Sequence, residues 1–315
     1  MMEYESRGLS PGASVAVLFG FIAVGLFIGS LAGLGVWVAM TGQGVLTLEK
    51  DMLNPQFANA ARMMQMVSVL IMFFVPAVAT ARLISRHPFE YLGFKTGFNA
   101  KQFLLVIAII LVCLPLVGAL GELNKAIPIG KTLTAFFKKM EDNYNSQVEA
   151  LAIMRSPAEF IFSLLVMALF PALFEETLFR GGLQQILIAW FKQPLAAIIV
   201  TSIIFSAVHF SYYGFLPRLA LGMVLGLIFY YSKSIWLNVT AHFVNNAFAI
   251  TYMYYLYTHG KPVRDVTDDN APIWMAIPAL ILVIVLLRTF KQISFRRNIN
   301  NIPPMDGPSV SSTLV

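Results

Sequence analysis

Two adjacent acids and one base stand alone in a long apolar stretch of this chain. They form the pattern Glu175-Glu176-x-x-x-Arg180 and are the only charged residues between Glu159 and Lys192. A charged side chain at membrane depth costs about 2.5 to 3.5 kcal/mol on the insertion scale, so such residues are usually functional. We therefore look for the function of the protein in this stretch.

The spacing of these three residues predicts different roles for the two acids. Glu176 and Arg180 are four residues apart, share one face of a helix and can form an ion pair inside the membrane. Glu175 is rotated by about 100° from Glu176 and is left without that partner. An unpaired carboxylate of this kind can act as a general base.

Two further polar patterns follow in later apolar stretches. The first is Phe205-x-x-x-His209, and the second is His242-x-x-x-Asn246, whose two side chains lie one helical turn apart on one face. An imidazole can accept a proton, donate a hydrogen bond or bind a metal, and an amide can donate to a developing oxyanion.

Each pattern also has a purely structural explanation. A buried histidine is usually a satisfied core residue, an acid-base pair can set the register between helices, and an asparagine can join two membrane helices. The combination of two acids, two histidines and one asparagine in a background nearly free of ionisable groups favours an active site.

The composition indicates what kind of molecule must position these residues. Of the 315 residues, 58% are hydrophobic and only 12% are charged, and the mean hydropathy is +0.73. This leaves too little polar surface to cover a soluble globule. We predict an all-α fold, a polytopic membrane helix bundle with a polar active-site cavity inside the membrane.

The apolar stretches predict about eight transmembrane helices, since one crossing needs about 20 residues. The sixth stretch is short, so seven helices with a re-entrant piece is the alternative. The predicted stretches are 14–40, 63–79, 103–120, 160–179, 195–212, 219–231, 235–255 and 273–287.

Basic residues in the loops predict the orientation, because Lys and Arg accumulate on the cytoplasmic side. The loop after the second stretch and the tail after the eighth are the most basic segments. We predict a protein of the cell inner membrane with both termini in the cytoplasm, although the lysines of loop 121–157 argue mildly against this. The basic residues of the two segments are Arg82, Arg86, Lys95 and Lys101, and Arg288, Lys291, Arg296 and Arg297.

The organisation of the chain is otherwise simple. We predict one transmembrane domain over residues 1–297, with the motifs in 160–250, and a disordered cytoplasmic tail over 298–315, which is rich in proline and serine. The net charge of +6 is explained by the basic loops, and no basic stripe suggests nucleic acid as a partner.

Loop 121–157 contains a helical pattern of its own. Apolar residues recur at spacings of three and four, which predicts an amphipathic helix along the membrane surface or across the end of the bundle. Packing explains this helix more simply than substrate recruitment does. The residues are Leu133, Phe136, Phe137, Met140, Tyr144, Val148 and Leu151.

The three polar patterns, in this order on successive apolar stretches, resemble a known family. The resemblance is to the CAAX-protease and bacteriocin-processing group of intramembrane proteases, which includes the prenyl-protein endopeptidase. It covers about residues 160–250, and Leu92-Gly93-Phe94 also resembles bacterial members.

The resemblance implies a role for each residue. Glu175 would activate the attacking water, with help from His209, and His242 and Asn246 would bind the oxyanion. Glu176, Arg180 and Phe205 would support the site. The roles are carried by the patterns Glu175-Glu176-x-x-x-Arg180, Phe205-x-x-x-His209 and His242-x-x-x-Asn246.

The family has also been described as metalloproteases, in which case His209, His242 and Glu175 are candidate ligands of a zinc ion. Catalytic zinc often takes two His and one Glu. However, the chain has no His-Glu-x-x-His pattern. We favour catalysis without a metal and keep zinc as the alternative.

We therefore predict an intramembrane endopeptidase that hydrolyses a peptide bond in a membrane peptide or protein. The alternatives are a non-proteolytic scaffold of the same fold, such as a bacteriocin-immunity protein, and a proton-coupled transporter. The absence of repeats between the two halves of the chain weakens the transporter hypothesis.

The predicted depths conflict with a shared site. On straight helices, His209 would lie farther across the membrane than Glu175 and His242. Either Pro171 and a re-entrant stretch at Gly181-Gly182 move Glu175 deeper, or the predicted boundaries of the fifth helix are wrong.

Overall fold

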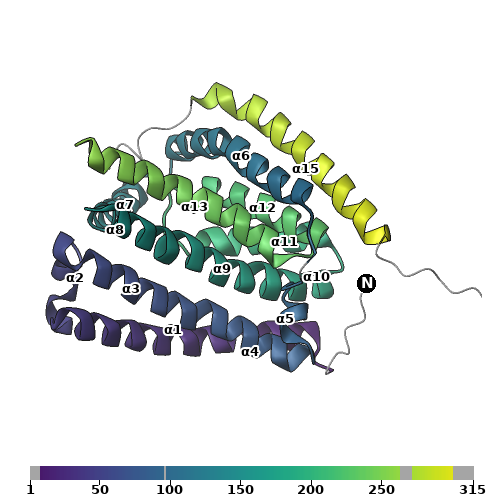
Figure 1. Cartoon of the computed structure of the whole chain (residues 1–315), viewed down its shortest axis with the longest axis horizontal. Coiled ribbons are helices and arrows are strands. Elements are labelled where there is room, and N and C mark those ends of the chain that lie inside the picture. Colours follow the sequence, from purple (N-terminus) through teal and green to yellow (C-terminus); the bar gives the residue numbers. More distant parts are fainter. Residues whose placement is uncertain (1–7, 96, 263–271, 301–315) are drawn as a thin grey trace, which may run out of the picture.

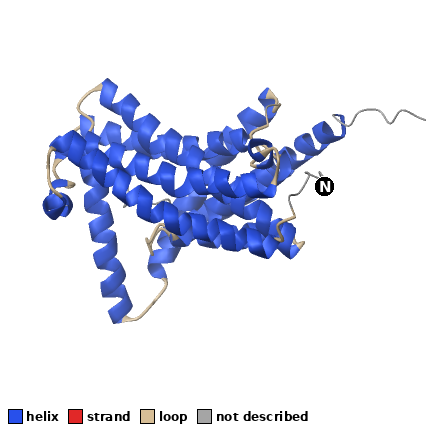
Figure 2. Cartoon of the chain, turned by 90° about the horizontal axis from the view of Figure 1, so that it is seen from below, coloured by secondary structure: helices blue, strands red, loops and turns tan. Residues whose placement is uncertain are grey.

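The computed structural model describes residues 8–95, 97–262 and 272–300, and all regular structure in these ranges is helical (Figure 1). Figure 2 shows helices and connecting loops, and no strand, in the described part of the chain. The prediction of an all-α fold is confirmed. The predicted tail lies outside the described residues except for 298–300, which end the last helix.

Eight helical segments form the layers of the described bundle, and two of them contain π-helical turns. They are α1 (Pro11–Thr41); α3 (Ala58–Val69), η3 (Leu70–Phe74) and α4 (Val75–Ile84) in one segment; α6 (Ala100–Ala126); α8 (Pro157–Ser163), η4 (Leu164–Leu169), α9 (Phe170–Glu176), η5 (Thr177–Gln184) and α10 (Gln185–Phe191) in one segment; α11 (Pro194–Ala207); α12 (Phe215–Ser232); α13 (Ile235–Thr258); and α15 (Ala276–Asn300). The π turns are η3, η4 and η5, so one segment holds two of them. Short helices α2 (Leu48–Asp51) and α5 (Pro88–Tyr91) lie in the loops.

Six of the helices in the described residues are long and apolar enough to cross a membrane. The chain is thus a multi-pass membrane protein. Of the other two long segments, α11 has only 14 residues, and α13 has 24 residues but carries the polar residues Asn238, His242 and Asn246. Helix α12 has 18 residues and is long enough to span, which disfavours the re-entrant alternative for the sixth stretch.

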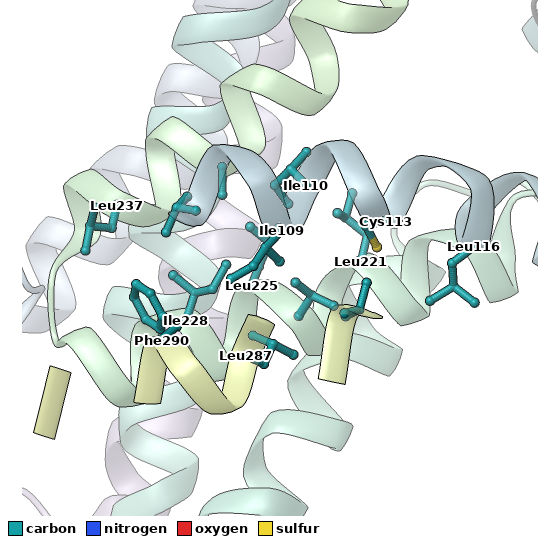
Figure 3. Close-up of a cluster of buried hydrophobic side chains, with 14 of the residues drawn as sticks. Ile109, Ile110, Cys113, Leu116, Leu221, Leu225, Ile228, Leu237, Leu287 and Phe290 are labelled. Carbon is teal, nitrogen blue, oxygen red and sulfur yellow. The ribbon is translucent and has the colours of Figure 1, made fainter. Parts of the chain in front are cut away.

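The helices form layers, and the catalytic candidates lie in the middle one. In Figure 1, α1 lies with α3 and α4 on one side, α6 and α15 lie on the other, and α9 to α13 lie between them. A buried apolar cluster joins α6, α12, α13 and α15 (Figure 3). It includes Ile109, Cys113, Leu225, Leu237 and Phe290.

Glycines allow α1 to pack closely on the second helical segment. Gly25, Gly29 and Gly33 are spaced by four residues and are buried on one face of α1. A Cβ atom at Gly29 would lie 2.9 Å from the carbonyl oxygen of Ser68, which is closer than real contacts allow. Small residues at this spacing bring two membrane helices together.

The amphipathic helix predicted in loop 121–157 is present as α7 (Lys131–Leu151). It is seen nearly end-on beside α8 in Figure 1, and Figure 2 shows one helix standing across the others at that end of the bundle. Its aromatic ring at Phe137 stacks on Tyr212, with the ring centroids 4.9 Å apart. Helix α7 therefore packs on the loop that follows α11.

The predicted boundary of the fifth helix is wrong. Helix α11 ends at Ala207, and residues 208–214 form a turn in which Phe210 has a left-handed φ of 50°. The residues around Gly181-Gly182 are not re-entrant, because they continue the helix as the π turn η5. His209 thus lies beyond the end of a short helix, which removes the conflict in depth.

Candidate active site

The Glu176 carboxylate is the centre of a buried network that joins three helices. Its Oε1 atom lies 2.9 Å from Nδ1 of His242, and its Oε2 atom accepts a hydrogen bond of 3.1 Å from Nδ2 of Asn238. The side chain of Glu176 has no exposed surface. This carboxylate therefore fixes the position of the α13 residues that face α9.

Arg180 forms an ion pair with Glu176, as the sequence predicts. Its Nε atom lies 3.3 Å from Oε2 of Glu176, and its Nη2 atom donates to the carbonyl of Gly222 at 3.3 Å. The guanidinium also lies 4.8 Å from the centre of the Phe205 ring, a cation–π contact. Arg180 thus connects α12 and α11 to the acidic pair.

Glu175 is placed differently from its neighbour. Its Oε2 atom lies 3.9 Å from Nε2 of His242, which is too long for a direct hydrogen bond. Within the described part of the chain, this oxygen has no hydrogen-bond partner, and the side chain is 13% exposed. A water molecule bound by both atoms would be in contact with a carboxylate that is free to take its proton.

The Phe205 ring contacts the imidazoles of both histidines. Its centroid lies 5.0 Å from that of His209 and 5.9 Å from that of His242, both in edge-to-face geometry. The carbonyl of Phe205 also lies 2.7 Å from Nδ1 of His209. A carbonyl can only accept, so Nδ1 carries the proton, and Nε2 of a neutral His209 is an acceptor.

Asn246 lies on the same face of α13, one turn beyond His242. Its Oδ1 atom accepts a 3.3 Å hydrogen bond from Nδ2 of Asn245, and the residue is partly exposed. The structure thus brings Glu175, His209 and His242 around Phe205 and the Glu176 network, and it places Asn246 at the edge of this group.

The π turn η5 explains how Arg180 and Gln184 both reach α12. A π turn shifts the helical register, and such turns are frequent at functional sites. Nε2 of Gln184 donates to the carbonyl of Gly226 at 3.0 Å, parallel to the bond from Arg180 to Gly222. A Cβ atom at Gly226 would lie 2.7 Å from Ile198 of α11, so glycine is required there.

Sequence reasoning missed Asn238 and Gln184. Asn238 donates to Glu176 and also, at 2.7 Å, to the carbonyl of Leu225. A signal for Asn238 was present, because Asn238, His242 and Asn246 recur every four residues on one face of a helix. Gln184 had a similar signal, four residues after Arg180.

The candidate zinc ligands do not form a ready metal site. Among the residues that the structure describes, no group of three or more His, Cys, Asp or Glu side chains is arranged to hold a metal ion. The Nδ1 atoms of His209 and His242 are engaged by the Phe205 carbonyl and by Glu176, which leaves the two Nε2 atoms as the nitrogens that could bind a metal. Zinc therefore stays the alternative to catalysis without a metal.

Comparison with known proteins points to one family. Residues 157–248 match the family model described as type II CAAX prenyl endopeptidase Rce1-like. Comparison with curated proteins and with solved structures finds no significant match. The matched segment runs from α8 into α13 and contains Glu175, Glu176, Arg180, His209 and His242. The match falls on the segment that carries the three motifs, and it confirms their resemblance to CAAX-type endopeptidases.

Proposed function

We propose that the protein is an intramembrane endopeptidase that cleaves a peptide bond in a membrane peptide or protein without a metal ion. The observation that carries the proposal is the 3.9 Å separation between Oε2 of Glu175 and Nε2 of His242, with Glu176 bonded to the far side of the imidazole. A free base, an oriented imidazole and a supporting carboxylate are groups that can hydrolyse an amide.

In the proposed reaction, Glu175 takes a proton from water while the water oxygen bonds to the carbonyl carbon of the substrate. The carbonyl oxygen becomes an oxyanion, and His242 and Asn246 donate to it through Nε2–H and the side-chain amide. Glu176 stabilises the protonated imidazole through its bond to Nδ1. The C–N bond then breaks, and Glu175 returns the proton to the leaving nitrogen.

We assign His209 an assisting role. With Nδ1 held by the Phe205 carbonyl, its Nε2 atom is free to accept a hydrogen bond from the attacking water. His209 would thus orient the water lone pair toward the substrate. Both imidazoles contact the Phe205 ring. In this assignment His209 orients the water, and His242 binds the oxyanion.

We also propose that the protein lies in the cell inner membrane with both termini in the cytoplasm. The segments rich in Arg and Lys after α4 and in α15 lie at one end of the bundle, together with Lys192 and Lys233. The active site would be reached from this side or from the bilayer.

A scaffold of the same fold remains the alternative, because the Glu176 network would also serve a purely structural role. The two hypotheses differ at Glu175, whose Oε2 atom contributes no hydrogen bond within the described residues. A structural role gives no reason to keep this carboxylate in the membrane, where it is costly.

The test compares the wild-type protein with Glu175→Gln, which keeps the shape and removes the base. We expect the variant to cleave membrane peptides about 10² to 10⁴ times more slowly than the wild type, with an unchanged unfolding temperature. Glu49→Gln, the same change at an exposed position, is the control. Cleavage by Glu175→Gln at the normal rate would refute the assignment.

The same preparations test the metal hypothesis. We expect elemental analysis to find no stoichiometric zinc, and cleavage to continue after dialysis against a chelator. Zinc at one ion per chain, with activity lost on chelation and restored by zinc, would overturn the metal-free mechanism.

A further inference from the structure

A basic cavity lies at the end of the bundle where α10, α12 and α15 meet. It has a volume of about 660 Å³ and is lined by three lysines, two tyrosines and apolar side chains. The residues that matter here are Lys192, Lys233, Lys291, Tyr230, Tyr231 and Phe295. None of them belongs to the candidate active site.

Two of the lysines occupy backbone positions that normally favour glycine. Lys192 follows α10 with a φ of 57°, and Lys233 follows α12 with a φ of 56°. The left-handed conformation costs a residue with a Cβ atom about 1 kcal/mol. Both of these helix ends thus place a lysine at the same cavity, although glycine would fit the backbone at a lower cost.

The cavity holds these charges without acidic partners. The Nζ atom of Lys233 lies 4.4 Å from the centre of the Tyr230 ring, and that of Lys291 lies 5.6 Å from the centre of the Tyr231 ring. Among the described residues, no carboxylate forms an ion pair with Lys192, Lys233 or Lys291. Burial lowers the pKa of the Lys233 ammonium, which is the response of a cation that lacks a counter-charge.

The surroundings of the cavity indicate the source of the missing anion. Trp190, Leu195 and Phe295 expose 51%, 57% and 64% of their surface beside the lysines. Aromatic residues and lysines at a helix end are typical of the interface between membrane and water. Basic pockets between membrane helices on the cytoplasmic side bind lipid head groups.

We propose that this cavity binds the phosphate of an anionic phospholipid head group. Lys192, Lys233 and Lys291 would neutralise the phosphate, the tyrosine hydroxyls would donate to its oxygens, and the exposed apolar residues would contact the acyl chains. The site goes beyond the proposed proteolysis and does not depend on it. It would anchor the junctions of α10 with α11 and of α12 with α13, which position both catalytic histidines.

The test measures lipid binding to the full-length purified protein by native mass spectrometry, with phosphatidylglycerol and phosphatidylcholine as probes. We expect retention of phosphatidylglycerol over phosphatidylcholine, and a loss of about fivefold in affinity for each lysine changed to glutamine. Lys101→Gln is the matched control, because Lys101 is an exposed lysine at the start of α6, at the same end of the bundle.

The variants are Lys233→Gln alone and the triple change of Lys192, Lys233 and Lys291 to Gln. Unfolding temperature in the absence of anionic lipid shows whether each variant is folded. If Lys233→Gln does not fold, Lys192→Gln and Lys291→Gln, both at exposed side chains, provide the same comparison.

Two results would overturn the proposal. One is a folded triple variant that retains phosphatidylglycerol as well as Lys101→Gln does. The other is binding of inorganic phosphate, measured by calorimetry, that depends on the three lysines while phosphatidylglycerol is not retained. A rise in the unfolding temperature of the wild type on addition of phosphatidylglycerol, with no such rise in the triple variant, would support the proposal.

Discussion

Nδ1 of His242 lies 2.9 Å from Oε1 of Glu176, and both side chains are buried. This bond joins α9 to α13 and sets which imidazole nitrogen faces Glu175. Glu176 is therefore more than the partner of Arg180, because it also orients a residue that we place in the reaction.

Glu176→Gln should reduce both stability and activity. The change leaves Arg180 buried without its counter-charge, at a cost of about 3 to 5 kcal/mol. It also removes the carboxylate that stabilises a protonated His242. Thermal unfolding in detergent and peptide cleavage measure the two effects.

A double variant separates the two roles of Glu176. Glu176→Gln with Arg180→Gln removes both buried charges, so we expect part of the lost stability to return while cleavage stays low. Full recovery of cleavage in the double variant would contradict the proposed support of His242.

Asn238→Leu should lower turnover more than it affects substrate binding. Asn238 donates to Glu176 and to the Leu225 carbonyl, so its loss leaves a buried acceptor unsatisfied, at a cost of about 1 to 3 kcal/mol. Glu176, and with it His242, would then be less well oriented. We expect kcat to fall with KM nearly constant.

The control for this variant is Thr251→Ala, on the same helix. Among the described residues, the hydroxyl of Thr251 bonds only to the Ala247 carbonyl of its own helix, and Thr251 is exposed. If Asn238→Leu changes kcat no more than Thr251→Ala does, Asn238 has no positioning role.

Glu141→Ala in α7 should slow cleavage without unfolding the protein. Oε2 of Glu141 accepts a 2.9 Å hydrogen bond from Ser211, which lies two residues after His209. Losing this bond should loosen the turn that carries His209, with a stability cost of about 1 kcal/mol. Asp142→Ala changes an exposed acid on the same helix and should leave the rate unchanged. Equal rates in the two variants would show that α7 does not support the turn.

Gly29→Leu should destabilise the bundle by about 1 to 3 kcal/mol through a clash with the second helical segment. A Cβ atom at Gly29 would already lie 2.9 Å from the Ser68 carbonyl, whereas at Gly35 nothing lies within 4 Å. Gly35→Leu is therefore the matched control on the same helix. Unfolding temperatures that drop equally in both variants would contradict the close packing of α1.

Much of the candidate site could be predicted from the spacing of residues along the chain. Glu176 and Arg180 pair because residues four apart share a helix face, and this relation holds wherever the helix lies. The same rule places His242 and Asn246 together on α13. The scarcity of charges in an apolar chain also showed which residues to examine, because lipid makes an idle charge costly.

The partners across helices could not be predicted in this way. Glu176 bonds to Asn238 and His242, more than 60 residues away in the chain. Which residues meet depends on the π turn η5 and on the close approach of α11 to α12 at Gly226. Neither the π turn nor this close approach can be predicted from the local sequence as directly as the contacts between residues four apart.

The sequence alone determined that the chain crosses a membrane, that it is helical and which polar residues are candidates for chemistry. These properties follow from composition and from short-range geometry along a helix. Only the tertiary structure decided that α11 stops at Ala207, that His209 lies in the turn beyond it, and that Glu176 rather than Glu175 holds His242. The reason is physical, because these contacts depend on how whole helices pack against one another, and the free energy of packing is shared among many distant residues.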